Sequence, residues 1–278
     1  IGFRLLPLLI QLGHDVVCSV RDKHRFSIPA EFESQVTVIE VDFSDSKTLS
    51  HIPKDIDAAY YLIHSMSTQG EDFERLEQQA AENFVQLIDQ TNCQQVIYLS
   101  GISQEKQLSK HLRSRAKVEE ILKQAQAKYT IFQSGIIVGS GSASFEIIRD
   151  IVEKLPVMIA PKWLNTNSQP IAISNVIEYL ISCLGREDCY DDSFEIGGPD
   201  ILTYKEMLLR FAKVRNLRRS IFTVPVMTPR LSSYWLYFVT ATSFPLAVKL
   251  VDSMKVDIVM QDKRILSIIP QELLSYQE

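Results

Sequence analysis

Apolar and polar residues follow two different patterns along the first half of the chain. Short apolar runs without strict alternation predict strands buried on both faces, and the stretches between them repeat apolar residues at helical spacing. Alternating strands and helices of this kind predict an α/β fold with a doubly wound, Rossmann-like parallel sheet. The predicted strands cover residues 15–20, 36–41, 58–63, 96–99 and 129–132, and the predicted helices cover residues 3–12, 73–91 and a stretch that includes His111, Arg115 and Glu119.

The chain opens with a helix, although a doubly wound domain normally begins with a strand and a glycine turn. Gly2 precedes the helical spacing of residues 3–12, and Gly13 follows it as the residue expected to end the helix. We therefore expect the first strand and most of its glycine-rich turn to lie upstream of residue 1. In that arrangement Gly2 is the last glycine of the fingerprint, where the helix packs close to the strand.

The second half of the chain has a looser pattern and predicts a smaller second lobe. Ser174 and Asn175 stand where a helix N-cap is expected, and Thr203 is expected to cap another helix. Residues 225–258 are aromatic and rich in proline, which is consistent with a small lid over the carboxyl edge of the sheet. The predicted elements are helices at 145–155, 176–184 and 204–214, strands at 170–173 and 194–199, and an irregular loop at 156–167. The Rossmann domain is expected over residues 1–140 and about 168–200, and the mostly helical substrate lobe over about 141–167 and 201–278.

Charge, hydropathy and cysteine content narrow the classes of function. The formal net charge of -5 argues against a sequence-independent nucleic-acid binder, which needs a basic surface. No secretory signal is visible, and no uninterrupted apolar run reaches the roughly 18 residues that cross a membrane. The cysteines show no ligand-like grouping with the histidines, so we expect no metal site. We expect buried free thiols at Cys18, Cys93 and Cys183, and hence a reducing, cytoplasmic location.

Basic residues follow the second strand expected in the Rossmann unit. At this strand end an acidic side chain accepts from the ribose of NAD, whereas an arginine favours the 2′-phosphate of NADP. Arg21 comes first here, with Lys23 close behind, and a guanidinium suits a phosphate. Asp22 is a competing carboxylate, and a solvated loop of mixed charge would have the same composition. The position of Arg21 favours NADP over NAD.

Two further strand ends carry candidate cofactor residues. Asp42 and Phe43 follow the next strand, where a carboxylate can meet the adenine amino group and an apolar ring the base; Asp42 can equally cap a helix. Leu62, Ile63 and His64 end the following strand, beside the expected nicotinamide-ribose region. A single histidine is more often structural than catalytic, so we expect His64 to be a cofactor neighbour.

The stretch from Val96 to Leu122 contains the residues best placed for chemistry. Ser100 and Gly101 follow an apolar strand, and His111 and Arg115 share one face of the next helix. The sequence places no acidic partner for the histidine and no nucleophile elbow around the serine, so hydrolysis is not expected.

Gly135 opens a glycine-rich stretch, residues 135–142, that follows a later strand. This stretch resembles a phosphate-binding loop but lacks the lysine of a P-loop. We expect its backbone to approach the substrate closely.

These segments together resemble the short-chain dehydrogenase/reductase superfamily, and specifically its atypical, NmrA-like branch. The resemblance rests on VVCSVRDKHRF at the second strand, VIYLSGIS before the predicted active-site helix, and PIAISNVIEYL with FEIGGPDILTYKEML in the second half. The chain is most similar to bacterial YbjT-like NAD(P)-binding proteins, often labelled nucleoside-diphosphate-sugar epimerase-like, over about residues 1–260. The resemblance implies a Rossmann domain that binds NAD(P) through a glycine-rich turn.

The resemblance also implies a departure from the usual active site. Active members use a YxxxK pair, in which the tyrosine exchanges a proton and the lysine lowers its pKa and holds the nicotinamide ribose; the matching positions here are His111 and Arg115. Arg115 can still bind the ribose but does not titrate, and His111 can relay a proton near neutral pH or cap the helix. Ser100 matches the family's serine. The catalytic candidates are therefore Ser100, His111 and Arg115, and the cofactor-binding candidates are Gly2, Arg21, Asp22, Lys23, Asp42, Phe43, Leu62, Ile63, His64, Ser100, Gly101, Arg115 and Gly135.

The leading hypothesis is an NADP(H)-binding protein of this type that transfers hydride to an apolar small molecule. Three alternatives stay open: a non-catalytic NAD(P)-sensing regulator, favoured by the missing Tyr-Lys pair; a nucleoside-diphosphate-sugar epimerase, disfavoured by the absence of that tyrosine; and an assembly role in which residues 225–258 dock on a partner or membrane surface. The protein is expected to be a monomer or a homodimer. The aromatic residues expected over the substrate are Trp163, Trp235, Tyr237 and Phe238.

Overall fold

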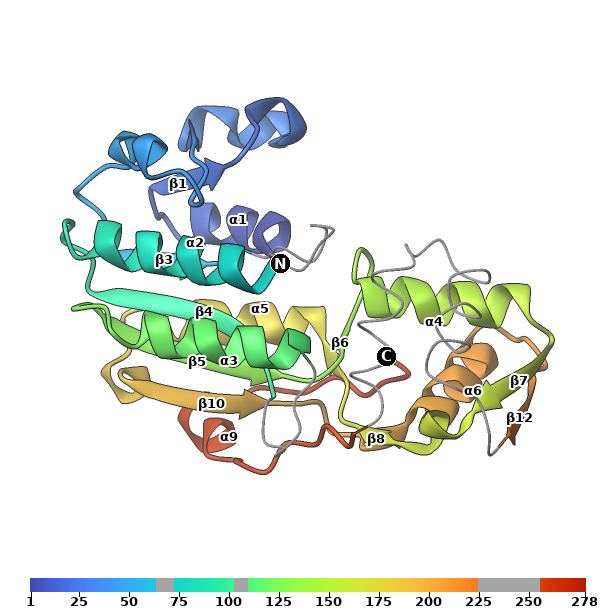
Figure 1. The fold of residues 1–278 in the computed structure, drawn as a ribbon. Helices are drawn as coiled ribbons and strands as arrows, with labels where there is room; N and C mark the ends of the chain where they lie inside the picture. Colours follow the sequence, from blue (N-terminus) through green and yellow to red (C-terminus); the bar gives the residue numbers. More distant parts are fainter. Residues whose placement is uncertain (64–72, 103–109, 225–255) are drawn as a thin grey trace. The chain divides into compact units, whose positions relative to one another are not determined.

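The computed structural model describes residues 1–63, 73–102, 110–224 and 256–278 (Figure 1). The chain divides into two compact units, each with its own buried apolar core. The first unit comprises residues 1–99, 116–131 and 177–193, and the second comprises residues 100–115, 132–176 and 194–278.

The main sheets are built from parallel strand pairs, as the sequence predicts. A two-stranded sheet pairs β1 with β2, and a four-stranded sheet has the order β10-β5-β4-β3. Among the described residues β1 pairs only with β2, and β3 only with β4. Parallel strands that alternate with helices confirm the α/β class. The strands of these two sheets are β1 (Val16–Val20), β2 (Val36–Glu40), β3 (Ala58–Tyr61), β4 (Gln95–Gly101), β5 (Lys128–Ser134) and β10 (Asp192–Ile196).

Helix α1 (Gly2–Gln11) ends where the sequence predicts. Gly13 has a φ of 86°, and its N–H donates to Ile10 while that of His14 donates to Leu9, which satisfies carbonyls of the last turn. The left-handed conformation at this position suits glycine, since a β-carbon would be strained there.

Helix α2 (Phe73–Ile88) and part of α3 (Lys110–Leu122) cover the core of the first unit (Figure 1). Ala80, Phe84 and Ile88 of α2 lie at helical spacing and are buried. The buried apolar residues of this core are Tyr61, Ala81, Phe84, Ile88, Val96, Tyr98, Val118, Ile121, Leu122, Ala127 and Ile131.

Gln95, at the start of β4, links three segments of the first unit through a buried hydrogen-bond network. Its Nε2 donates to Thr130 Oγ1 at 2.8 Å and to the Cys183 carbonyl at 3.0 Å, and its Oε1 accepts from the Gly185 N–H at 2.8 Å. Thr130 in turn donates to the Cys189 carbonyl at 2.8 Å. Every polar atom of this amide has a partner, so its burial is compensated.

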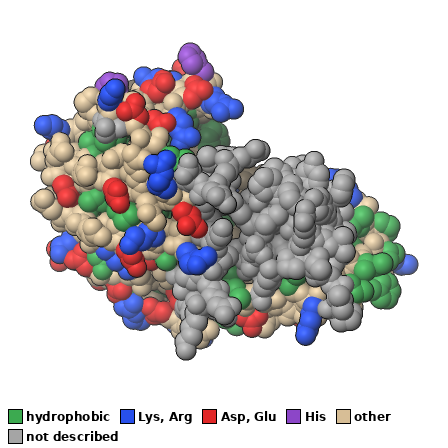
Figure 2. Space-filling model, in the orientation of Figure 1, with side chains coloured by type: hydrophobic (Ala, Val, Ile, Leu, Met, Phe, Trp, Pro, Cys, Tyr) green, Lys and Arg blue, Asp and Glu red, His purple; other side chains and the backbone are tan. Residues whose placement is uncertain are grey.

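The second unit is centred on two helices and a parallel ribbon. α4 (Ala143–Lys154) and α6 (Tyr204–Val214) pack on β7 (Val157–Pro161) and β12 (Ser220–Val224), which pair in parallel. The prediction of an irregular loop at 156–167 is therefore wrong over β7. Two prolines and Trp163 obscured the alternation of exposed Val157 and Ile159 with buried Met158 and Ala160. Figure 2 shows hydrophobic side chains gathered at the right of the view, over this ribbon.

The remaining elements of the second half are short. β6 and β9 form one parallel pair, and β8 and β11 form one antiparallel pair. The glycine-rich stretch 135–142 thus contains a strand residue pair, Ile137–Val138, and is not wholly a loop. These elements are β6 (Ile137–Val138), β8 (Asn167–Ser168), β9 (Ile171–Ala172), α5 (Ile173–Ser182), β11 (Leu202–Thr203) and α9 (Ile265–Ile268).

Two predicted helix caps have different outcomes. Thr203 caps α6 as predicted: its Oγ1 accepts from the Glu206 N–H at 3.1 Å, and Glu206 accepts from the Thr203 N–H at 2.7 Å. The predicted N-cap at Ser174 and Asn175 is wrong, because both residues lie inside α5. The Asn175 side chain instead holds the C-terminal segment, donating to the Gln271 side chain and the Glu272 carbonyl, both at 2.8 Å.

All four cysteines are free thiols, but their burial differs from the prediction. Cys183 and Cys189 are buried, whereas Cys18 and Cys93 are half-buried. Burial raises the pKa of the Cys93 and Cys189 thiols to about 11 and that of Cys183 further. Within the described ranges no helix is long and apolar enough to cross a bilayer.

We expect Gln95→Leu to lower the free energy of unfolding by about 2–4 kcal/mol, because the substitution leaves the Gly185 N–H without an acceptor and removes the hydrogen bonds to Thr130 Oγ1 and the Cys183 carbonyl. Gln90→Leu is the matched control, since Gln90 is exposed and bonds only to the backbone of its own helix turn. Urea unfolding followed by circular dichroism measures both. Equal midpoints for the two variants would contradict the assignment.

We expect a thiol reagent at about pH 8 to label Cys183 and Cys189 slowly in the native protein, since a raised pKa keeps them protonated and burial excludes the reagent. After unfolding in urea, all four thiols should react. Peptide mapping of the labelled sites makes the measurement. Rapid native labelling of Cys183 would show that this part of the first unit opens readily.

Candidate functional site

The first candidate cluster lies in the first unit, at the carboxyl ends of β1 and β2. The Val41 N–H donates to the Val20 carbonyl at 2.8 Å, so the two strands end together and Arg21 and Asp42 leave them side by side. Arg21 Nε lies 3.6 Å from Asp42 Oδ2, and 66% of the arginine side chain is exposed. A guanidinium this open has donors left for an anion.

One carboxylate oxygen of Asp42 holds the following turn, and the other faces Arg21. Its Oδ1 accepts from the Ser44 N–H at 2.9 Å and the Ser44 hydroxyl at 2.6 Å. Partial burial acts to raise the pKa of Asp42, but the Ser44 hydrogen bonds and the Arg21 charge outweigh it and hold the pKa below its usual value. Asp42 is therefore ionised at neutral pH.

Asp22 and Lys23 belong to the short 3₁₀ turn Lys23–Arg25. The Asp22 carboxylate accepts from the His24 N–H at 2.9 Å and so caps this turn. The carboxylate that competed with Arg21 in the sequence is thus engaged with its own backbone. Lys23 is exposed within the turn.

Phe43 and Ile63 pack against the core of the first unit, and Leu62 is half-buried. The Phe43 ring is 5.8 Å from that of Phe84, and its carbonyl accepts from Asn83 Nδ2 at 2.7 Å. Phe43 and Ile63 are half-buried and pack against the core, so each keeps part of its surface accessible.

Gly2 lies at the first turn of α1, next to Leu62. A β-carbon at this position would meet only Leu62 Cδ1, at 3.5 Å, which is an ordinary contact. The described surroundings therefore do not demand glycine here. His64 falls outside the described residues.

The second candidate cluster lies in the second unit, at the carboxyl end of β4. Ser100 and Gly101 are the last residues of the strand, whereas the sequence pattern placed them just after it. Ser100 is 2% exposed, and within the described residues its Oγ has no hydrogen-bond partner. An unsatisfied buried hydroxyl is unusual in a folded protein, because it loses its hydration without compensation.

Helix α3 packs closely against this strand end. A β-carbon at Gly101 would lie 3.0 Å from Leu112 Cδ2 and 4.0 Å from Arg115 Cδ, so glycine lets the helix approach. The Ile102 N–H donates to the Ser134 carbonyl at 3.1 Å and joins the ends of β4 and β5. The structure thus brings Arg115 to Gly101. His111 lies one turn earlier in α3, and its side chain falls outside what the structure describes.

Gly135 directly follows β5 and has close neighbours. Its β-carbon would lie 3.2 Å from Ile258 Cγ2 and 3.5 Å from the Gln169 carbonyl. The Gln169 N–H donates to the Ile258 carbonyl at 3.0 Å, so this segment stays in place beside Gly135. Gly135 is thus covered here by residues of its own unit.

Gln169 and Glu195 are polar residues that the sequence reasoning missed. Gln169 accepts from the Met260 N–H at 3.0 Å and donates to the Gly198 carbonyl at 2.6 Å, and buried Glu195 accepts from the Gln261 and Asp262 N–H groups. Both position the returning C-terminal segment. The sequence signal for this close packing was the double glycine of FEIGGP, which follows Glu195. A β-carbon at Gly198 would clash with the carbonyl oxygen of Pro170, the residue after Gln169.

Of the aromatic residues expected over a substrate, only Trp163 lies in the described ranges. Its ring packs edge-on at 6.1 Å from Tyr204, against the core of the second unit. Trp235, Tyr237 and Phe238 fall outside the described residues. Those ranges also contain no group of three or more residues able to hold a metal ion.

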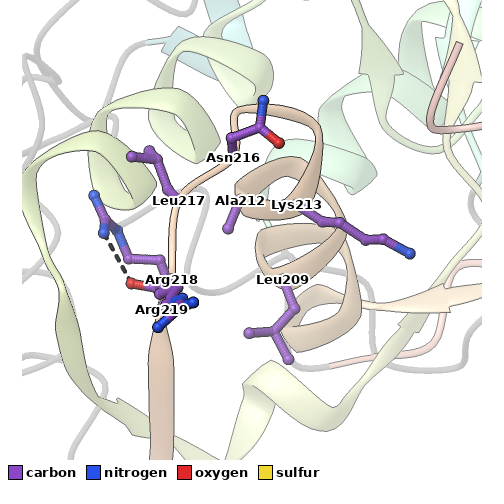
Figure 3. Close-up of a pocket in the computed structure, with 7 residues that line it drawn as sticks. All are labelled: Leu209, Ala212, Lys213, Asn216, Leu217, Arg218 and Arg219. Carbon is purple, nitrogen blue, oxygen red and sulfur yellow. Dashed lines mark hydrogen bonds between the residues drawn. The ribbon is translucent and has the colours of Figure 1, made fainter.

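An open hollow of about 470 Å³ lies at the end of α6, and none of the candidate residues lines it (Figure 3). Arg219 beside it donates to the Val152 carbonyl at 2.5 Å and the Glu153 carbonyl at 3.3 Å, and so caps the C-terminus of α4. The residues that line the hollow are Leu209, Ala212, Lys213, Asn216, Leu217, Arg218 and Arg219.

Both clusters lie at the carboxyl ends of parallel strands, the place where open α/β proteins bind their ligands. Residues 1–152, more than half of the chain, match the NAD(P)H-binding family, and the chain belongs to that family. The predicted family of NAD(P)-binding proteins is confirmed. None of the curated proteins matches the sequence.

Solved structures share the fold at low identity. A nucleoside-diphosphate-sugar epimerase from Staphylococcus aureus aligns with a TM-score of 0.77 at 13% identity, covering 99% of this chain and 94% of that one. The NADPH-dependent quinone oxidoreductase QOR2 from Escherichia coli, solved with NADPH, aligns with a TM-score of 0.75 at 13% identity, covering 99% and 93%. The Bordetella bronchiseptica enzyme WbmH with NAD+ aligns with a TM-score of 0.67 at 11% identity, covering 100% and 91%. At these identities the likeness concerns the fold.

Proposed function

We propose that this protein is an NADPH-dependent reductase of an apolar small molecule. The observation that carries the proposal is the buried Ser100 hydroxyl at the end of β4, which has no partner among the described residues. Membership of the NAD(P)H-binding family supports it, as does the fold shared with a quinone oxidoreductase. A hydroxyl donor kept dry at a strand end suits a substrate carbonyl oxygen.

The residues present fit NADPH on the adenosine side. Arg21 would bind the 2′-phosphate, since its guanidinium is open to solvent and only loosely paired, at 3.6 Å, with Asp42. Asp42 and Phe43 would meet the adenine, and Gly2, Lys23, Leu62 and Ile63 would line the same cofactor. The Asp22 carboxylate accepts a hydrogen bond from its own turn, so in this proposal Arg21 determines the preference for NADPH over NADH.

At the carboxyl end of β4, Ser100, His111 and Arg115 would each have a different role in the reaction. The bound cofactor supplies the hydride. Ser100 would donate a hydrogen bond to the substrate oxygen and stabilise the negative charge that develops there. His111 would hold the proton that this oxygen takes up, and Arg115 would hold the nicotinamide ribose without exchanging a proton. Gly101 would let α3 hold Arg115 close to the end of β4, whereas Gly135 is covered by Ile258 and Gln169 and takes no part in this assignment.

A further strand completes the proposed Rossmann layer. The edges of β1 and β3 have no second partner among the described residues, and an open edge of a buried parallel sheet leaves backbone groups without hydrogen bonds. We propose that a strand leading into a glycine-rich turn pairs with both edges. The free thiols further favour a reducing, cytoplasmic location for the protein.

A non-catalytic NAD(P) sensor is the second candidate. The observation that favours it is Arg115 beside Gly101, at the position where the resemblance places a lysine, with His111 in place of the tyrosine: the usual proton-exchanging pair is missing, and an arginine exchanges no proton. A sugar-nucleotide epimerase has less support, since the position of the family's tyrosine is His111 here.

The proposal is tested by calorimetric titration with NADPH and NADH, followed by cofactor oxidation with panels of quinones and aldehydes. Binding with turnover supports the reductase. Binding without turnover on either panel favours the sensor. Failure to bind either dinucleotide overturns both.

We expect Arg21→Ala to weaken NADPH binding by about tenfold to a hundredfold, because a charged hydrogen bond to the 2′-phosphate is lost. NADH has no such phosphate, so its affinity should change little. Arg186→Ala is the matched control, since Arg186 is a surface arginine paired with Asp188. Calorimetry gives the four affinities. Equal losses for NADPH and NADH would exclude the phosphate assignment.

We expect Ser100→Ala to lower kcat/KM by about a hundredfold or more, because the donor to the substrate oxygen is lost, and to leave NADPH affinity unchanged. Ser182→Ala is the control, since its hydroxyl bonds only to exposed Glu178. His111→Ala should abolish turnover if His111 supplies the proton. Steady-state kinetics with the active panel member measures all three, and unchanged turnover in a variant would remove that residue from the mechanism.

A further inference from the structure

The parallel ribbon of β7 and β12 presents an apolar outer face. Val157 and Ile159 of β7 are each 59% exposed, and Phe222 of β12, the register partner of Ile159, is 61% exposed. The inner face of the same ribbon, with Met158 and Ile221, is buried against α4 and α6. An aromatic and two branched side chains clustered in solvent are costly, and such clusters mark interaction surfaces.

The two strands of the ribbon and the residues next to them in sequence carry positive charge only. The segments 154–162 and 213–224, which contain the two strands and their approaches, carry no acidic residue, although the whole chain has a net charge of -5. The cations in these segments are Lys154, Lys162, Lys213, Arg215, Arg218 and Arg219. Acidic residues outnumber basic ones in the whole chain, yet these two segments contain basic residues only.

Three of the cations remain available to a partner. Arg219 caps α4, Arg215 pairs with Glu153 at 3.1 Å, and Lys154 pairs with Asp150 at 3.1 Å. Across the described ranges Lys162, Lys213 and Arg218 form no ion pair, and all three are exposed. Figure 3 shows the Lys213 side chain extending away from the end of α6.

We propose that the outer face of the β7–β12 ribbon docks on the surface of a bilayer that contains anionic phospholipids. Apolar side chains would enter the boundary between headgroups and acyl chains, and the flanking cations would meet lipid phosphates, the combination by which peripheral proteins bind. A second copy of this chain fits less well, because a self-complementary contact would bring like charges together. This inference does not depend on the proposed reductase activity.

The test uses the full chain with phosphatidylcholine vesicles, with and without phosphatidylglycerol, in a sedimentation assay at low and high salt. We expect binding to the anionic vesicles, little binding to the neutral ones, and a loss of binding as salt screens the cations. Equal binding to both vesicles, or binding to neither, overturns the proposal.

Two variants and their matched controls assign the face. We expect the double variant Lys213→Glu with Arg218→Glu to weaken binding to anionic vesicles by more than about 20-fold, since each cation contributes about fivefold. Its control is Lys47→Glu with Lys54→Glu, which makes the same change in net charge in the first unit and should bind normally. Phe222→Ser should weaken binding by about tenfold, and Phe3→Ser, at 60% exposure on α1, should not.

Circular dichroism melting confirms that each variant is folded. Sedimentation velocity without vesicles tests the rival proposal, in which a second copy of this chain covers the face. A concentration-dependent dimer that Phe222→Ser abolishes would assign the face to a second copy and overturn the bilayer proposal. Equal losses in the ribbon variants and their controls would also overturn it, since net charge or general apolar exposure would then explain the binding.

Discussion

The burial of β4 is the constraint on which the rest of the structure depends. Its residues from Gln95 to Ser100 are all buried, and a buried strand tolerates polar side chains only where partners are supplied. At the start of the strand the Gln95 side chain donates two hydrogen bonds and accepts one, all with two other segments. At the carboxyl end the Ser100 hydroxyl receives none from the described residues. The hydrogen bonds of Gln95 therefore stabilise the start of β4, whereas the Ser100 hydroxyl at its carboxyl end has no partner among the described residues.

Local physics made much of the fold predictable from the sequence. Gly13 and Thr203 end and begin their helices through contacts within four or five residues, and both predictions were confirmed. β7 was missed because its partner β12 lies about sixty residues away, so no neighbouring pattern reveals the pairing. Asn175 was assigned to a cap because a side chain that bonds to residues almost a hundred positions away looks, in sequence, like any polar residue before a helix.

The sequence predicted those candidate residues that directly follow a strand, because strand ends can be recognised from the apolar pattern. Arg21 and Asp42 were selected because they follow parallel strands, and the structure places them together. The role of Asp22 depended on its carboxylate turning back to the His24 N–H, which composition does not reveal. Gln169 and Glu195 escaped prediction for the same reason as β7: each bonds to the backbone of a distant segment. Long-range hydrogen bonds leave no periodic signal in the sequence.

The distribution of charge limits what the net charge of -5 can exclude. Electrostatic forces between exposed groups fade over about 8 Å in physiological salt, so a ligand responds to the nearest side chains and not to the sum over the chain. Arg21 faces solvent beside one carboxylate, and the β7–β12 ribbon has cations on both strands' approaches without any acid among them. An acidic protein can therefore carry local surfaces with exposed cations. Composition excludes a broad basic surface, but it leaves such local sites to be found from the fold.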